Sequence, residues 1–482
     1  MPESARAQTV RIQPQVDARL IYSDNVRAGD DGRGDWRAEL SPGISILRES
    51  GRFSGNLNAR LRSVVHADET DRNDTFLALQ GRGRIEAVER TLFLDMDATA
   101  SRNNRSQLSG RRAGDQLDTD SSNETRSIGI GPRLEFMLGP ETHGTVSYMS
   151  RWLGGNGSID GRREADWRAL LANPVQFGRI GWGLAYTRSD TDYGDSASNA
   201  VSEETARATL FATVTPQFRL RGIVGYESND YEVRSGEHST IVGGGFDWNP
   251  TERTAISATT EKRIFGRGYD LRFSHRAVRS SWNLSYSRDI SSSLQAQGLD
   301  VFGDPEFRAL YDALANGIPD PIEREAFVRA QLGYPAIGQR DSFLTNARFL
   351  NRSLVGSVSL IGIRNVVTIV LQQSERSRLG GAVTSDPLDD FARFDTVTTR
   401  SATAAFSHRL SQLSSLNASV LRSRAKGSGE SRADTERTVF SIGVSTQFGP
   451  DTSGGLTYTH QRSDGQSDFV ENVLTANLGM RF

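Results

Sequence analysis

The sequence predicts an all-β protein, a transmembrane antiparallel up-and-down β-barrel of about 22 strands, within a range of about 18 to 24. Three observations carry this prediction. Apolar side chains recur at every second position along most of the chain. The links between these segments alternate between short and long. The last residue, Phe482, is an aromatic that ends one such segment. We expect a single barrel domain over 10–482.

The N-terminal residues 1–9 are expected to be the end of a signal peptide or a disordered terminus. Ala5, Arg6 and Ala7 have the A-x-A arrangement found before a signal-peptide cleavage site. No charged and apolar region precedes them, and chance explains so short a motif equally well.

Period-two alternation defines the strands one after another. Phe53, Leu57 and Leu61 face one way and Arg60 and Arg62 the other. The same pattern returns at 92–100, 128–136 and 180–186. An arginine facing lipid at the bilayer midplane would cost about 2–4 kcal/mol, so the polar face must point into the lumen. The residues expected to line the pore are therefore Arg52, Arg60, Arg62, Arg133 and Arg481.

The links between the strands are sorted by length. The short links include 139–141, 215–217, 249–251 and 449–451, and the long links include 23–34, 104–123, 189–202 and 291–342. Only 265–267 is a short link on the long side. Short periplasmic turns and long extracellular loops characterise outer-membrane barrels. The expected location is the cell outer membrane of a Gram-negative bacterium, with outer-membrane lipid and lipopolysaccharide as partners.

The closing strand carries Leu478, Met480 and Phe482 on its apolar face. A closing strand that ends on an aromatic resembles those of bacterial outer-membrane barrels, in which it belongs to the signal for insertion. This resemblance implies that the barrel-insertion machinery is a partner and that these three residues form the signal.

One long link, 291–342, shows helical spacing instead of alternation. Asp304-Pro305 and Asp320-Pro321 are suited to begin two short helices. Their apolar residues include Phe307, Leu310, Tyr311, Leu314 and Phe327. These helices are expected to form either a lid or plug in the lumen or a compact cap on the loops.

Composition narrows the chemistry. The chain has no cysteine, and 57 basic residues face 59 acidic ones, which argues against nucleic-acid binding. No catalytic or metal-binding motif occurs, so we expect no enzyme activity, no cofactor and no metal. Acidic groups such as Asp386, Asp389 and Asp390 leave open a Ca²⁺ site, with solvated loop charge as the default.

Several motifs resemble one known family, the outer-membrane β-barrel proteins associated with the PEP-CTERM/exosortase system. They include Tyr22-Ser23-Asp24-Asn25-Val26, Leu40-Ser41-Pro42-Gly43-Ile44, Gly181-Trp182-Gly183-Leu184-Ala185-Tyr186, Trp282-Asn283-Leu284-Ser285-Tyr286-Ser287, Phe343-Leu344-Thr345-Asn346 and Tyr458-Thr459-His460-Gln461-Arg462. These are strand and turn patterns. The resemblance implies a role beside exopolysaccharide synthesis or export, with exopolysaccharide and its export proteins as partners.

Three functions remain open. The first is exopolysaccharide export or assembly through a gated or plugged polar pore. The second is a non-conducting structural barrel or one that binds polysaccharide at its surface. The third is a rim-sited enzyme, for which no Ser/His pair or carboxylate pair stands out.

Overall fold

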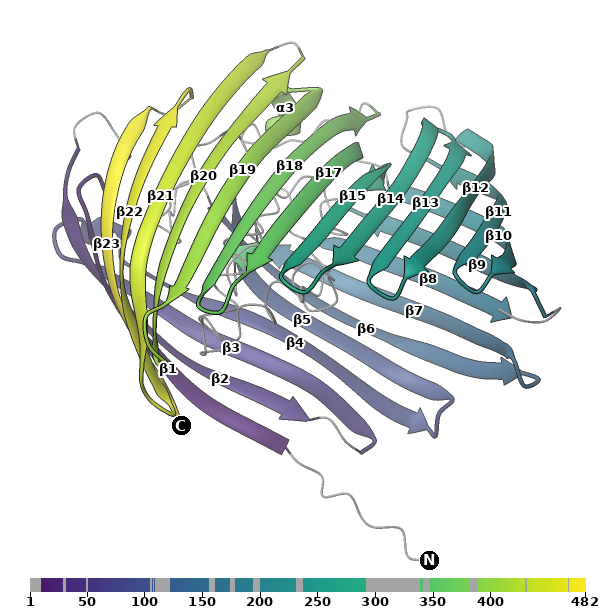
Figure 1. The fold of residues 1–482 in the computed structure, drawn as a ribbon, viewed down its shortest axis with the longest axis horizontal. Helices are drawn as coiled ribbons and strands as arrows, with labels where there is room; N and C mark the ends of the chain where they lie inside the picture. The colour runs from purple at the N-terminus through teal and green to yellow at the C-terminus, as the bar shows by residue number, and fades with distance from the viewer. Residues whose placement is uncertain are drawn as a thin grey trace, which may run out of the picture.

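The computed structural model describes residues 10–28, 32–48, 51–104, 106, 108, 122–155, 161–173, 178–193, 200–230, 237–291, 339–340, 347–380, 389–429, 431–466 and 468–482. Within these ranges, one sheet holds 23 strands, of which β16 (Gln339–Arg340) is a two-residue parallel addition. The other 22 strands form a closed antiparallel barrel, which confirms the predicted fold (Figure 1).

The outward-running strands are β1 (Val10–Ser23), β3 (Phe53–His66), β5 (Leu92–Asn104), β7 (Thr142–Gly155), β9 (Ile180–Asp192), β11 (Phe218–Asn229), β13 (Thr254–Arg263), β15 (Ser280–Ser291), β18 (Asn365–Leu379), β20 (Ser414–Ser428) and β22 (Thr452–Asp464). The returning strands are β2 (Asp35–Arg48), β4 (Asp74–Val88), β6 (Ser122–Leu138), β8 (Arg162–Asn173), β10 (Val201–Thr215), β12 (Glu237–Thr251), β14 (Gly266–Arg276), β17 (Arg348–Ile361), β19 (Thr396–Arg409), β21 (Arg432–Gly449) and β23 (Phe469–Arg481). Two short helices in the links complete the described elements, η1 (Thr70–Arg72) and α3 (Asp390–Arg393). No helix in these ranges is long and apolar enough to cross a bilayer.

The barrel closes between its first and last strands. β1 pairs with β23 from Gln15 opposite Arg481 to Ser23 opposite Val473, and on its other side with β2. At the periplasmic end the amide of Phe482 donates to the carbonyl of Pro14 at 2.9 Å. Because the number of barrel strands is even, both chain ends leave from the same rim, the lower one in Figure 1.

The two faces of each strand differ as the alternation predicts. On β3, Leu61 and Val65 are 46% and 57% exposed on the outer face, whereas Arg62 and Val64 are 5% and 4% exposed on the inner face. Residues that pair directly across antiparallel strands share a face, so the register carries this inner face around the barrel. The outer face of β3 is therefore apolar and meets lipid, whereas outward charges such as Arg422 and Arg424 lie toward the extracellular ends of their strands.

Tryptophans gather near both rims. Trp36 and Trp152 lie near the extracellular ends of their strands, Trp167 near the middle of β8, and Trp248 and Trp282 near the periplasmic ends. Each is between 43% and 47% exposed. Indole rings favour the bilayer–water interface, so the tryptophans near the strand ends are placed to form two aromatic girdles.

The observed turns differ from the sequence prediction in one detail. The sequence predicts a turn at residues 249–251, but β12 continues to Thr251 and the turn lies at Glu252 and Arg253. Pro250 is tolerated within the strand because it lies at the rim, beyond the regular part of the ladder. The short link after Arg263 lies on the extracellular side as expected.

Two predictions concern parts of the chain that are only partly described. The lid or plug residues Phe307, Leu310, Tyr311, Leu314 and Phe327 lie outside the described residues, as does 1–9. Of the insertion 291–342, the structure describes Ser291 at its start and β16 near its end.

Candidate functional site

Two of the arginines predicted to line the pore, Arg60 and Arg62, lie on the inner face of β3. Arg62 lies on the inner face of β3 and donates through Nε to Glu39 Oε1 at 2.8 Å. Arg60, two residues earlier on the same face, forms an ion pair with Asp17 at 3.7 Å. Both therefore point inward and are neutralised by acidic side chains from β1 and β2.

The other three predicted arginines lie on the inner side or at the rim. Arg133, on β6, lies 3.1 Å from Asp95 and 3.2 Å from Glu135. Arg481 ends β23 opposite Gln15, on the inner face. Arg52 is exposed just before β3 begins, at the periplasmic rim.

These arginines belong to a much larger charged surface on the inner face of β1–β14, which we name the charged wall. Its members include Asp17, Arg19, Arg37, Glu39, Arg60, Arg62, Asp95, Asp97, Arg133, Glu135, Arg151, Glu164, Asp166, Glu203, Arg207, Arg219, Arg221, Glu227, Asp247, Glu261, Arg263, Asp270 and Arg272. Opposite charges are interleaved on neighbouring strands. Arg151 contacts Asp97 at 2.9 Å, and Arg263 contacts Glu227 at 2.7 Å.

The inner face of β15 and β17–β23 has a different chemistry, and we name it the neutral wall. Its members are Ser281, Asn283, Ser285, Ser287, Ser353, Val355, Ser357, Ser359, Thr368, Val370, Gln372, Ser374, Thr399, Ser401, Thr403, Ala405, Asn417, Ser419, Leu421, Ser423, Val439, Ser441, Gly443, Ser445, Gly455, Thr457, Thr459, Gln461, Val473, Thr475 and Asn477. Charged residues on these inner faces, among the described residues, lie toward the strand ends: Asp289, Arg376, Arg378, Arg409, Arg437, Glu471 and Arg481.

The sequence contains a signal for the neutral wall that alternation alone did not bring out. From about residue 280 onward, the polar positions of successive strands are mostly Ser, Thr, Asn and Gln, whereas earlier strands carry Arg, Asp and Glu there. The barrel gathers the later strands side by side, so a difference along the chain becomes a difference between two sides of one lumen.

An apolar cluster lies on the extracellular part of the neutral-wall side, and we name it the inner cap. Its buried members are Leu108, Ala347, Phe349, Phe391, Phe394, Val397 and Ala425. Phe349, Val397 and Ala425 belong to the inner faces of β17, β19 and β20. Phe391, from α3, stacks on Phe349 with ring centroids 5.7 Å apart. The part of the β18–β19 link that contains α3 therefore lies on the inner side of the barrel.

Leu108 reaches this cluster from another part of the barrel. It belongs to the link between β5 and β6, yet its carbonyl accepts a hydrogen bond from Thr435 Oγ1 on β21 at 2.9 Å. Ser106, from the same link, donates to Asp390 of α3. Strands β5 and β21 are not neighbours in the barrel, so Ser106 and Leu108 join two distant parts of it.

Two further contacts join segments that are not neighbours in the barrel. Backbone pairing places Gln339 and Arg340, from the insertion between β15 and β17, beside Arg102 and Asn103 of β5. Arg348, at the start of β17, contacts Glu203 of β10 at 3.0 Å. Described residues from several links therefore meet non-neighbouring strands at the extracellular end of the barrel.

Two members of the acidic group considered for Ca²⁺, Asp389 and Asp390, have structural roles, and the third, Asp386, lies outside the described residues. Asp389 caps the N-terminus of α3 by accepting from the amide of Phe391 at 2.9 Å, and Asp390 accepts from Ser106. Both carboxylates are buried by these contacts. The part of the chain that is described contains no group of three or more acidic or histidine residues arranged to hold a metal ion.

The three residues of the predicted insertion signal all lie on the lipid-facing surface. Leu478 and Met480 are 39% and 38% exposed on the outer face of β23, and Phe482 is 72% exposed beyond its end. Their neighbour Gly479 faces inward, opposite Asp17. The apolar stripe is therefore continuous up to the C-terminal aromatic.

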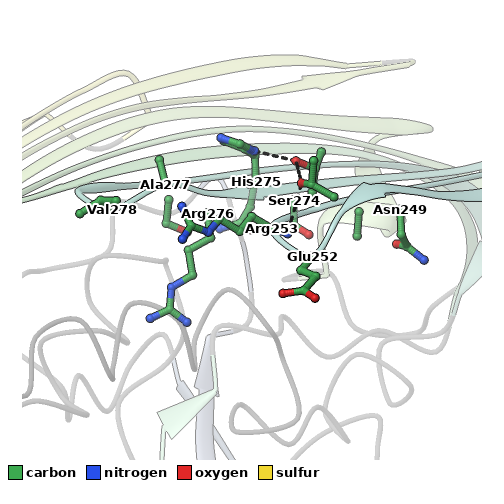
Figure 2. A pocket seen from close by; sticks show the side chains of 13 residues that line it. Asn249, Glu252, Arg253, Ser274, His275, Arg276, Ala277 and Val278 are labelled. Atoms are coloured by element: carbon green, nitrogen blue, oxygen red, sulfur yellow. Dashed lines mark hydrogen bonds between the residues drawn. The ribbon is translucent and has the colours of Figure 1, made fainter. Parts of the chain in front are cut away.

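A polar pocket of about 760 Å³ opens at the periplasmic rim between the turns that join β12 to β13 and β14 to β15 (Figure 2). Its lining includes Glu252, Ser274 and Arg276, together with Ser281 and Asn283 of the neutral wall. In Figure 2 His275 lies on the other side of the sheet from Glu252, and its Nδ1 is 2.8 Å from Thr254 Oγ1. The pocket thus adjoins the periplasmic start of the neutral wall.

Comparison with known proteins supports the fold. No family model and no curated protein matches the sequence. Among solved structures, the FrpB iron transporter of Neisseria meningitidis is similar at a TM-score of 0.55 and 10% identity, over 97% of this chain and 81% of that one.

Two further structures are similar to the same degree. The siderophore receptor PirA of Acinetobacter baumannii has a TM-score of 0.53 and 9% identity, over 99% of this chain and 81% of that one. The ferric-catecholate receptor Fiu of E. coli has a TM-score of 0.50 and 9% identity, over 97% and 81%. At such identities the likeness concerns the fold alone. Together with the lipid-facing surface, it identifies this chain as a 22-stranded β-barrel of the Gram-negative outer membrane.

Proposed function

We propose that this protein is a gated outer-membrane passage that takes part in exopolysaccharide export or assembly, as a member of the PEP-CTERM/exosortase-associated barrel family. The observation that carries the gating is the inner cap. Leu108 and Phe391 come from two different extracellular links and meet against the inner face of the barrel. Links that fold inward narrow a lumen at one end, and displacing them would widen it.

The strand number supports a passage. Barrels of about 22 strands enclose a lumen wide enough to need a plug or to conduct water. Both walls are polar, so the lumen suits hydrated solutes. Ion pairs neutralise much of the charged wall, as Arg62 with Glu39 and Arg151 with Asp97 illustrate. Interleaved charges of both signs create little net field to retain an ion of either sign.

The inner cap is held by weak and separable contacts, as a gate requires. Burying one phenylalanine contributes about 1.5–3 kcal/mol, and a single hydrogen bond such as that from Thr435 to Leu108 contributes about 0.5–1.5 kcal/mol. Such energies can be overcome by a partner or a polymer that binds the open form better.

The test is single-channel recording in planar bilayers, comparing the full chain with a form lacking 291–342 and with Phe391→Ser. We expect small or rare conductance steps from the full chain and larger steps from both altered forms. Each alteration loosens the extracellular end of the barrel. Phe448→Ser is the matched control, since Phe448 is 67% exposed at a periplasmic turn and outside the inner cap. Silence in every form would favour the alternative, a non-conducting structural or polysaccharide-binding barrel.

A second candidate function follows from the structural neighbours, several of which are described as siderophore receptors. In this alternative, the same barrel takes up a ferric chelate from outside. Titration of the purified protein with ferric enterobactin distinguishes the two, because saturable binding there would favour uptake over export.

A further inference from the structure

The two walls of the lumen differ in how much of their hydrogen-bonding capacity is already used. On the charged wall, acidic and basic side chains occupy one another, as for Arg133 with Asp95 and Arg263 with Glu227. A solute that passes this wall must compete with charge-assisted contacts, which are about twice as strong as neutral ones.

The hydroxyl and amide groups of the neutral wall have more hydrogen-bonding positions than their bonds to one another use. A hydroxyl provides one donor and two acceptor positions, and an amide provides two of each. The contacts between neighbours, such as Ser359 with Thr368 at 3.2 Å and Ser441 with Thr459 at 3.1 Å, are single bonds. Ser441 and Thr459 are only partly buried and Gln372 is exposed, so positions there remain accessible, whereas Ser359 and Thr368 are buried.

The spacing of these groups suits a chain that slides. Side chains on one face of a strand recur about every 6.5–7 Å, and adjacent strands lie about 4.8 Å apart. A polymer that loses one partner therefore finds another within a few ångströms. Many equivalent weak contacts allow entry without trapping, which is the general requirement for conduction through a binding pore.

The pocket in Figure 2 lies where this wall begins. Its volume of about 760 Å³ falls within the range of about 300–1,000 Å³ typical of small-molecule sites. Asn283 and Ser281 belong both to the pocket lining and to the neutral wall. A sugar held in the pocket would therefore already touch the first residues of the wall.

We infer that the neutral wall is the contact surface for an uncharged polysaccharide, and that the pocket between the β12–β13 and β14–β15 turns is its periplasmic entry subsite. This inference rests on the proposed function and specifies its substrate class. A polyhydroxyl chain matches a wall of hydroxyl and amide groups because each partner both donates and accepts. The cations of this wall among the described residues lie toward the strand ends: Arg376, Arg378, Arg409, Arg437 and Arg481. A polyanion would therefore find hydroxyl and amide groups along the middle of the wall. The pocket lining contains Arg253 and Arg276 together with Glu252.

The test uses the full chain, purified in a detergent without a sugar headgroup, and isothermal titration with a neutral dextran oligosaccharide and with dextran sulfate. We expect the neutral oligosaccharide to bind more tightly than the sulfated one. Gln372→Ala, on the neutral wall, and Asn283→Ala, in the pocket, should each weaken neutral binding by about two- to tenfold, which corresponds to the loss of a hydrogen bond.

The matched control is Gln80→Ala, which removes the same side chain from the inner face of β4 on the charged-wall side. Its affinity for neutral dextran should be unchanged. Tighter binding of dextran sulfate, an equal loss in Gln80→Ala, or no binding of dextran at all would each overturn the inference. The conductance experiment does not use dextran. A negative titration result therefore overturns this inference without bearing on whether the barrel conducts.

Discussion

The guanidinium of Arg348 lies 3.0 Å from the carboxylate of Glu203, joining β17 to β10 although these strands are not neighbours in the barrel. A second nitrogen of Arg348 donates to Thr191 on β9 at 3.0 Å. Arg348 is 4% exposed, so these contacts are sheltered from solvent. They act as a strut near the extracellular end, beside the inner cap, because Arg348 lies between the cap residues Ala347 and Phe349.

Removing this strut should loosen the extracellular end. Arg348→Ala leaves Glu203 without its charge partner, and we expect lower thermal stability, by no more than the roughly 3–5 kcal/mol lost from fully buried pairs. We also expect more frequent channel openings in planar bilayers. Arg352→Ala is the control, because Arg352 pairs with Glu375 at 3.6 Å in an exposed setting worth about 0.2–1 kcal/mol. Equal behaviour of the two variants would contradict a strut.

The seam between β1 and β23 should depend on Glu471. This residue is 1% exposed and accepts from Ser23 Oγ at 2.6 Å. Glu471→Ala should lower the free energy of unfolding by about 1–3 kcal/mol, because it leaves a buried hydroxyl without an acceptor. Glu471→Gln, whose amide oxygen can still accept, should lose less. Thermal unfolding followed by circular dichroism checks both, and an Ala variant as stable as the parent would refute the prediction.

The C-terminal aromatic should matter for assembly more than for stability. Phe482 is 72% exposed, so Phe482→Ala removes little packing, and refolded protein should unfold near the parent temperature. If Phe482 belongs to the insertion signal, the amount of folded barrel in the outer membrane should fall several-fold. Phe448→Ala, which alters a similarly exposed phenylalanine, should assemble normally. The amount of each variant is measured by quantifying folded protein in isolated outer membranes. The unfolding temperature is measured on the refolded protein.

Gly131 is required where β6 and β7 approach closely. A Cβ added at this position would collide with the carbonyl oxygen of Tyr148. Gly131→Ala should therefore destabilise the barrel by about 1–3 kcal/mol, as overpacking does. Gly183→Ala is the control, since its Cβ would meet Phe211 at an ordinary 3.6 Å. Chemical denaturation of the two variants distinguishes a local clash from a general effect of replacing glycine.

Much of the fold could be predicted because the information is local. Alternation at Leu61 and Arg62 fixes which face of β3 meets lipid, since burying a charge in the bilayer is costly and a shift of one residue would reverse both side chains. The links between strands alternate between short and long along the chain. This alternation predicts that successive strands run in opposite directions and that their number is even.

The candidate site depended on contacts that no local pattern encodes. Leu108 is an ordinary loop residue in the sequence, yet it is fully buried against β21, more than three hundred positions later. Asp389 looked like a member of an acidic cluster, and only the position of α3 makes it a helix cap.

The sequence by itself therefore determined the barrel, its approximate strand number, its two faces and its expected membrane, because lipid imposes a period of two on every strand. Only the tertiary structure decided which residues meet inside. Closing the ring brings β1 beside β23 and collects the strands from β15 onward into one neutral wall. The pairing of distant side chains across a lumen depends on the curvature and register of the whole sheet, which no single segment specifies.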